Sequence, residues 1–228
     1  MKYLITTIFA LLIFTGQIKA AQLDSYYCFS TTEPQAVFEK FDNYLNSDAA
    51  KGLPVVRLWS MALNGPNPET HCAVFENADG DGFESMIGIF QEQEGQDFLR
   101  DLNTVIIDGL EGAGTPILSY GQSDFSKNPA LILYNLRVKN PVKYAKIWSE
   151  LMESSNFQGS GTLFEDTFTG ETGRTHYIGM SGSSLESLRK ELNRSLSSEE
   201  GKAFRRKAKE VRKVLSVYLM YHIKSWNE

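Results

Sequence analysis

Histidine and cysteine are scarce in this sequence, which contains only three histidines and two cysteines. A zinc site needs about four closely spaced ligands, and neither residue type forms such a cluster. No C-x-x-C-H motif is present, so the attachment site of a c-type haem is missing. The G-x-S-x-G motif of serine hydrolases and the nucleotide-binding patterns G-x-x-x-x-G-K and G-x-G-x-x-G are also missing. These absences exclude the common enzyme classes that a short motif reveals.

Long apolar runs are lacking after the first twenty residues, so no later segment is expected to cross a membrane. Residues 1–20 have the order of a secretory signal peptide, with Lys2 first, an apolar run over residues 3–14 and a small residue at Ala20. The alternative is an uncleaved anchor, but this run is short for a membrane span. We therefore expect cleavage after Ala20 and export to the periplasm or the medium.

The two cysteines permit a single disulfide, Cys28 with Cys72. An even number of cysteines favours a disulfide in an exported protein. The bond would close a loop of about 44 residues and contribute on the order of 4 kcal/mol in the chain-entropy model. The alternative is a pair of buried free thiols.

Charge is distributed unevenly along the chain. Residues 21–126 contain 4 Lys+Arg and 17 Asp+Glu, a net charge of −13, whereas residues 127–228 contain 17 and 11, a net charge of +6. Oppositely charged halves would attract each other, or would allow molecules to form a homo-oligomer. The alternative explanation of this uneven charge is that the surface residues of the two duplicated units diverged without a functional consequence. Export and the acidic first half both argue against nucleic acid as a partner.

A repeated Thr-His pair reveals an internal duplication. Residues 57–71 align without a gap with residues 162–176, and both segments end in Thr-His. The segments 94–100 and 200–206 share Glu, Gly, Phe and Arg at nearly the same offset. Matches in the same order and at similar spacing indicate two copies of one structural unit.

Each copy has the pattern of a β-α-β-β-α-β unit. In the second copy we expect a strand at 130–138, a helix from Pro141, a hairpin across 161–182, a charged helix from Ser184 interrupted near 197–201, and a strand at 214–226. The first copy repeats this order. This is the ferredoxin-like plan, a four-stranded antiparallel sheet with both helices on one face. We place the two repeats at residues 21–126 and 127–228.

Two ferredoxin-like repeats in one chain resemble a tandem member of the dimeric α+β barrel superfamily. That group includes antibiotic-biosynthesis monooxygenase-like, NIPSNAP-like and chlorite-dismutase-like proteins. The resemblance rests on element order and duplication over all residues after the signal, and no motif selects one member family. It implies an α+β pseudo-dimer within one chain, whose two antiparallel sheets leave a cavity for a substrate or haem.

Alternation along the last strand predicts which side chains face this cavity. Tyr218, Met220 and His222 share a mixed polar and apolar face, opposite an apolar face suited to helix packing. On the first strand of the same copy, alternation places Asn135 and Arg137 in the cavity beside His222. This group suits an anionic aromatic ligand. If the cavity is catalytic, we expect His222 as general base, Arg137 as anion clamp and Tyr218 as hydrogen-bond donor.

Three further patterns have both a functional and a structural interpretation. His71 and His176 occupy equivalent places and could meet around a ligand, but a turn hydrogen bond explains a Thr-His pair as well. Residues 76–84 resemble the start of a calcium loop but lack its final glutamate, which favours a turn and helix cap. The basic segment 202–214 could contact an anionic surface, although its apolar face favours an amphipathic helix.

The sequence therefore predicts an exported small-molecule-binding protein that holds a partly apolar ligand between two ferredoxin-like sheets. One alternative is an enzyme of the dimeric α+β barrel type, either a cofactor-independent monooxygenase or a haem-dependent enzyme. A second alternative is a non-catalytic oligomeric assembly protein. No motif identifies the ligand or a cofactor.

Overall fold

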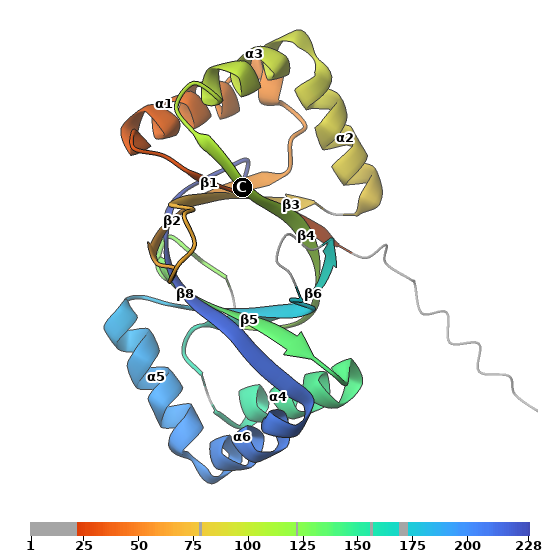
Figure 1. Cartoon of the computed structure of the whole chain (residues 1–228), viewed down its shortest axis with the longest axis vertical. Helices are drawn as coiled ribbons and strands as arrows, with labels where there is room; N and C mark the ends of the chain where they lie inside the picture. The colour runs from red at the N-terminus through yellow and green to blue at the C-terminus, as the bar shows by residue number, and fades with distance from the viewer. Residues whose placement is uncertain (1–21, 78, 122, 156, 169–172) are drawn as a thin grey trace, which may run out of the picture.

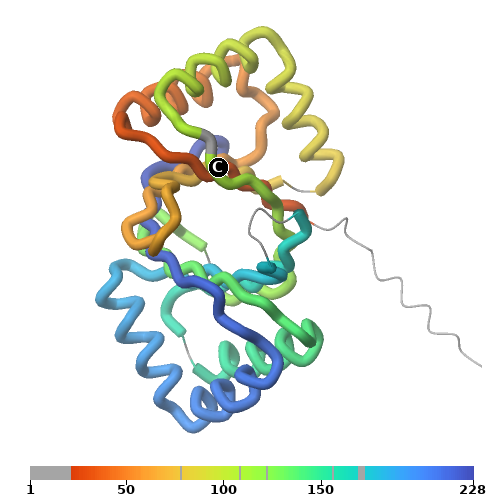
Figure 2. Tube along the Cα trace, in the orientation of Figure 1, coloured from red at the N-terminus to blue at the C-terminus, as the bar shows by residue number. Residues whose placement is uncertain are grey.

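A computed structural model of the 228-residue chain describes residues 22–77, 79–121, 123–155, 157–168 and 173–228 (Figures 1 and 2). The expected signal peptide at residues 1–20 lies outside the described residues. Within the described ranges, no helix has both the length and the apolar character needed to span a membrane.

The chain forms two successive β-α-β-β-α-β units, in each of which a pair of short helices takes the place of the second helix. The first unit consists of β1 (Leu23–Ser30), α1 (Pro34–Leu45), a 3-10 turn η1 (Asp48–Ala50), β2 (Val55–Leu63), β3 (His71–Asn77), α2 (Gly80–Gln91), α3 (Gln93–Leu102) and β4 (Ile107–Tyr120). The second consists of β5 (Ala130–Val138), α4 (Pro141–Ser155), β6 (Ser160–Phe168), β7 (His176–Gly182), α5 (Leu185–Ser197), α6 (Glu199–Val211) and β8 (Arg212–Trp226).

The helix pairs explain the second match in the repeat, Glu-Gly-x-x-Phe. A Cβ atom at Gly95 or at Gly201 would overlap the backbone of the preceding helix, so only glycine lets the next helix begin so close. Three residues later, Phe98 and Phe204 are buried in the two helix–sheet cores. The predicted interruption near 197–201 is therefore confirmed, and Ser198 caps α6 by accepting a hydrogen bond from the Gly201 N–H.

The eight strands form a closed antiparallel barrel in the order β1-β3-β2-β8-β5-β7-β6-β4. Each unit supplies four neighbouring strands, and the junctions between units are the pairs β2–β8 and β4–β6. Helices α1–α3 cover one side of the barrel and α4–α6 cover the opposite side (Figure 1). The predicted α+β fold of two ferredoxin-like repeats is confirmed, and the sheets also join along both edges, which leaves no open strand edge.

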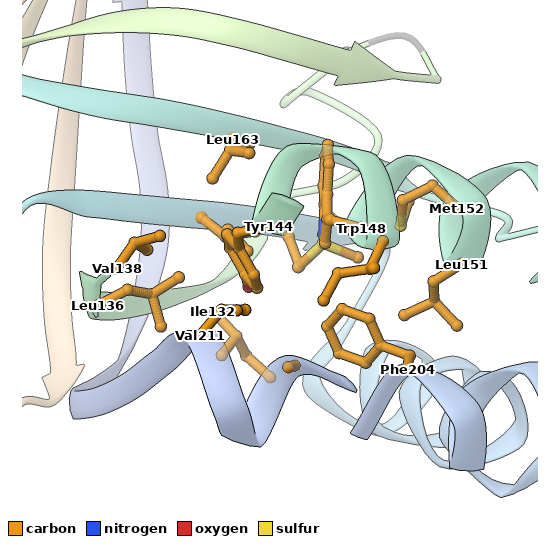
Figure 3. Packing of buried hydrophobic residues seen from close by; sticks show 14 of the residues in the cluster. Ile132, Leu136, Val138, Tyr144, Trp148, Leu151, Met152, Leu163, Phe204 and Val211 are labelled. Carbon is orange, nitrogen blue, oxygen red and sulfur yellow. The ribbon is translucent and has the colours of Figure 1, made fainter. Parts of the chain in front are cut away.

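Each unit has its own core between helices and sheet. The second core packs Leu136, Tyr144, Trp148, Leu163 and Phe204 between α4, α6 and the barrel wall (Figure 3). The first core contains Trp226, the last residue of β8, whose Nε1 donates to Asp42 of α1 at 2.9 Å. The end of the chain thus packs inside the unit that the beginning of the chain forms.

The predicted disulfide is present. Cys28 of β1 and Cys72 of β3 are directly opposite each other in the antiparallel pair, and they are bonded. Both residues are buried, and both line the interior of the barrel. The bond therefore braces the barrel wall from inside.

Replacing both cysteines with alanine should lower the free energy of unfolding by about 2–4 kcal/mol, because the unfolded chain regains the freedom of an open loop. Denaturant unfolding monitored by circular dichroism would measure the loss, and reductant should bring the wild-type protein to the same value. As a control, alkylation of denatured wild-type protein without reductant should modify neither cysteine. Modification of both would contradict the bond.

Candidate functional site

The barrel encloses a cavity of about 290 Å³, close to the lower end of the range for small-ligand sites. Both units contribute to its wall. The wall is mainly apolar, with aromatic and aliphatic side chains from several strands, among them Trp59, Leu110, Leu131, Leu133, Phe164 and Met220. Polar and charged side chains also line this space, among them Asp24, Arg57, Glu69 and Arg174.

Two glycines of β4 make room for two cavity tyrosines. A Cβ atom at Gly112 would overlap the Tyr26 ring, and one at Gly114 would overlap the Tyr177 ring. The two tyrosine rings meet edge to face, with centroids 6.4 Å apart. The Gly-Ala-Gly sequence of β4 therefore fixes the shape of this part of the wall.

Arg174 lies at the cavity wall, and internal partners engage its guanidinium. Its Nε and Nη2 donate to the Asp166 carboxylate at 2.8 and 3.0 Å, and its Nη1 donates to Asn135 Oδ1 at 3.0 Å. Nη2 also donates to Tyr26 Oη, and the guanidinium lies 4.9 Å from the centroid of the Tyr177 ring. Because Asp166 neutralises it in a bidentate pair, Arg174 is a rigid part of the wall rather than a free cation.

Arg57, the second arginine of the wall, is paired in the same way. Its Nε lies 2.6 Å from the Glu76 carboxylate, and its Nη1 contacts Glu228 near the chain end. The guanidinium also lies over the Phe125 ring, 4.9 Å from its centroid. Neither arginine of the cavity is left to neutralise an anionic ligand.

Asp24 is a cavity carboxyl, and no cationic side chain among the described residues is in direct contact with it. It is only 8% exposed, and the Gln22 amide donates to its Oδ1 at 3.0 Å. Burial raises the pKa of Asp24 from 3.8 to about 7, and the nearby negative charge of Glu76 adds to the increase. At neutral pH this group can therefore either accept or donate a proton, which suits acid–base catalysis.

Two of the residues predicted from alternation along β8 line the cavity, namely Tyr218 and Met220. The Tyr218 hydroxyl is fixed, because Asn67 Nδ2 donates to it at 2.6 Å. Asn135 is fully buried and joins Arg174 to Ser216, to whose Oγ its Nδ2 donates at 2.9 Å. Asn135 is not among the side chains that line the cavity, and its neighbour on β8 is Ser216 rather than His222, so its expected place in the cavity beside His222 is wrong. The catalytic and binding roles expected of Tyr218 and Met220 stay predictions.

The structure does not bring His222 and Arg137 together, so their expected proximity is wrong. Both residues lie late in their strands, and antiparallel pairing of β5 with β8 places them at opposite ends. Arg137 is opposite Lys213, is exposed, and donates from Nε to the Gly173 carbonyl at 2.9 Å. Its expected role as an anion clamp beside His222 therefore has no geometric basis.

His222 is the direct cross-strand neighbour of Trp59, but it is not among the side chains that line the cavity. Its ring centroid is 5.2 Å from that of Trp59 and 5.8 Å from that of Phe125, and its Nε2 is 2.8 Å from Ser225 Oγ. Burial, together with the positive charge of Arg57, lowers the pKa of His222, so the imidazole is neutral at pH 7. Its role as general base stays a prediction.

The two Thr-His pairs make equivalent contacts in the two units. Thr70 Oγ1 lies 2.9 Å from His71 Nδ1 and accepts from the backbone N–H that follows β1 at 3.1 Å. Thr175 Oγ1 lies 3.0 Å from His176 Nδ1 and accepts from the backbone N–H at the end of β5 at 2.8 Å. Burial lowers the pKa of both histidines, and neither lines the cavity. Their geometry matches the turn hydrogen bond rather than a shared ligand site.

The barrel cavity offers no histidine that could ligate haem. None of the three histidines is among the side chains that line the barrel cavity, so a histidine-ligated haem has no ligand there. In the part of the chain that the structure describes, no group of three or more His, Cys, Asp or Glu residues could hold a metal ion. In the calcium-loop-like segment, Asp79 caps α2 by accepting from the Gly82 N–H at 2.9 Å.

The basic segment at 202–214 forms most of α6 and the start of β8. Phe204, Ala208 and Val211 are buried against the sheet, which is the apolar face that the sequence indicated. Its lysines and arginines lie mostly on the exposed side of the helix, where Lys207 contacts Glu150 of α4 at 3.0 Å. This is the pattern of an amphipathic helix with a solvated charged face.

The charged residues of the cavity were not predicted from the sequence, among them Asp24, Glu69 and Arg174. Glu69 and Arg174 directly precede the two Thr-His pairs, so the repeat alignment itself places them at equivalent positions. Both lie outside the strands, where alternation gives no information. Asp24 alternates with Tyr26 and Cys28 along β1, which is the signal that could have identified it.

The Asp166→Asn variant should lower the free energy of unfolding by about 3–5 kcal/mol, because it leaves the Arg174 guanidinium buried without a counterion. Urea unfolding would measure the loss. Adding Arg174→Met to the same variant should recover most of it, since no buried charge then remains. A double variant as unstable as the single one would contradict a role for the ion pair.

The Asp24→Asn variant should be more stable than the wild type at pH 8, by up to about 4 kcal/mol, and similar in stability at pH 4. The raised pKa means that the folded protein keeps a proton that the unfolded chain releases near pH 4. The stabilisation from that proton is lost as pH rises through about 7. Urea unfolding between pH 4 and 8 would test this, and an equal difference at both ends would contradict it.

No protein-family model and no curated protein sequence matches the chain. Solved structures with the same fold include a proposed monooxygenase from Fusobacterium nucleatum, with 14% identity, TM-score 0.61, and coverage of 92% of this chain and 95% of that one. An anthrone oxidase-like protein has 10% identity, TM-score 0.59, and coverage of 92% and 95%. A proposed chlorite dismutase has 7% identity, TM-score 0.54, and coverage of 90% and 96%. The chain has the dimeric α+β barrel fold, and its neighbours belong to that superfamily.

Proposed function

We propose that this chain is an enzyme of the monooxygenase-like type that holds a small, partly apolar substrate inside the barrel. The observation that carries the proposal is the environment of Asp24, a buried carboxyl on the wall of a mainly apolar cavity, with a pKa raised to about 7. Perturbed carboxyls in clefts are typical of acid–base catalysts. The cavity therefore offers both a binding space and a proton acceptor that is active near neutral pH.

The chemistry that suits this site begins with proton removal. A substrate with a weakly acidic O–H or activated C–H group next to Asp24 would give that proton to the carboxylate. The substrate carbanion that remains would transfer electrons to O₂, the oxidant of the reaction, and a C–O bond would form. The resulting peroxide anion would take the proton back from Asp24, and loss of water from this hydroperoxide would leave a carbonyl product. The apolar wall, with Trp59 and Phe164, would keep bulk water away from the carbanion.

The fold comparison supports this class of function but not a substrate. The neighbours that are named as a proposed monooxygenase and an anthrone oxidase-like protein share the barrel at 14% and 10% identity. At such identity the likeness concerns the fold alone. The haem-dependent alternative is not favoured, because no histidine lines the cavity.

Export, oligomerisation and the repeat boundaries remain proposals. Residues 1–20 support export, and the Cys28–Cys72 bond is compatible with an oxidising compartment. The acidic and basic halves support a homo-oligomer as a second proposal. The change of copy between residues 126 and 127 is supported by the duplication of the strand and helix order on either side.

Oxygen uptake with anthrone and hydroxylated aromatic compounds, without added cofactor, would test the function. The Asp24→Asn variant should lower kcat/KM about 100-fold or more, because the amide cannot accept the proton. The wild-type kcat/KM should rise with pH through about 7, as the carboxylate form of Asp24 becomes populated.

A matched control is Asp48→Asn, which changes an exposed carboxyl of η1 and should leave the rate unchanged. Full activity in the Asp24→Asn variant, or activity only after haem is added, would refute the proposed function. Tight binding of an aromatic compound without oxygen uptake would favour a non-catalytic binding protein instead.

A further inference from the structure

We infer that Glu69 binds a protonated amine, so that the barrel cavity takes a small aromatic amine rather than an anionic compound. The inference rests on the proposed function in one respect only, that the cavity is the ligand site. It concerns which chemical class of ligand enters the cavity, whether or not the ligand is then oxidised.

Glu69 is a buried cavity carboxyl with an unsatisfied oxygen. It lines the cavity, is 8% exposed, and its Oε2 has no hydrogen-bond partner among the described residues. A Cβ atom at Gly109 of β4 would lie 2.9 Å from Glu69 Cγ, so this glycine makes room for the side chain. A buried carboxyl oxygen without a donor is costly, and a donor from the ligand would remove that cost.

Comparison of the two repeats shows which partner Glu69 lacks. Glu69 and Arg174 are equivalent, since each precedes a Thr-His pair and lines the cavity. Arg174 is neutralised by Asp166, and the equivalent of Asp166 in the first repeat is Met61. The backbone places Met61 and Asp166 alike, because the N–H of each donates to the carbonyl of the threonine in its own repeat, at 2.8 and 2.9 Å. The first repeat therefore has a charged residue, Glu69, but an uncharged residue, Met61, at the position where the second repeat has the counterion.

The charge balance of the cavity favours a cation. Both of its arginines are paired with carboxylates of the protein, Arg174 with Asp166 and Arg57 with Glu76. No cationic side chain in the described part of the chain is paired with the other two cavity carboxyls, Asp24 and Glu69. An anionic ligand entering the cavity would be repelled by these carboxyls. An ammonium group of a ligand would instead supply the positive charge and the hydrogen-bond donor that Glu69 lacks.

The aromatic part of the ligand follows from the wall. Trp59, Tyr218 and Phe164 surround the same space in which Glu69 lies. Aromatic faces bind the apolar body of an arylalkylamine and also attract its ammonium group. A volume of about 290 Å³ suits a compound with one aromatic ring.

Three probes with one skeleton test the inference by isothermal titration calorimetry: tyramine (amine), tyrosol (alcohol) and 4-hydroxyphenylacetate (acid). Wild-type protein should bind tyramine about 10- to 100-fold more tightly than tyrosol, and the acid most weakly. The Glu69→Gln variant should bind tyramine no more tightly than tyrosol, with the affinity for tyrosol within about twofold of the wild type. The control Glu94→Gln, at an exposed position of α3, should keep the wild-type preference.

Thermal stability without ligand gives a second readout. The Glu69→Gln variant should unfold at a temperature about 2–4 °C higher, because it removes an unpaired buried carboxylate. A lower unfolding temperature would show that Glu69 has a structural partner and would overturn the inference. Equal binding of the alcohol or acid, or an amine preference that survives Glu69→Gln, would overturn it too, while leaving the cavity as the ligand site. If none of the three probes binds to the wild-type protein, the result contradicts both this inference and the proposed function.

Discussion

Closure of the barrel through the hydrogen-bonded pairs β2–β8 and β4–β6 is the constraint on which the rest of the structure depends. These two junctions join two half-barrels into one wall, so that the inner faces of the strands line a common, mainly apolar cavity. Polar groups inside must then be paired or change their ionisation state. The pairing of Arg174 with Asp166, and the raised pKa of Asp24, are both consequences of this closed, mainly apolar interior.

Duplication supplies the barrel with two similar halves, and divergence of a few side chains makes the interior asymmetric. The Thr-His pairs retain the same turn hydrogen bonds in both units. One position earlier, the first unit has Glu69 and the second has Arg174, and the place of Asp166 is taken by Met61. Similar backbones thus present opposite charges to one cavity. A ligand held there meets different chemistry at its two sides, which a symmetric dimer of identical subunits could not provide.

Local patterns predicted the elements well, because their causes are local. Pro34 and Pro141 begin helices, and in the second copy Asn140 caps the helix by accepting from the Lys143 N–H. The site was harder to predict, because it depends on pairing between strands that are far apart in sequence. Alternation places Tyr218 and Met220 on the cavity wall, but it says nothing about which end of β5 meets which end of β8, and so Arg137 was placed beside His222. The antiparallel direction already implied by the ferredoxin-like plan excludes that pair. Glu69 and Arg174 stand in turns before strands, where periodicity carries no signal.

The claim that the closed barrel creates a catalytic environment rests on the ionisation of one carboxyl. Carbon-13 NMR of aspartate-labelled protein, with Asp24→Asn used to assign the resonance, measures that ionisation directly. We predict that the Asp24 carboxyl titrates with a midpoint near 7. A midpoint near 4, that of an aspartate in water, would show that solvent reaches this part of the barrel and would contradict the enclosed acid–base site.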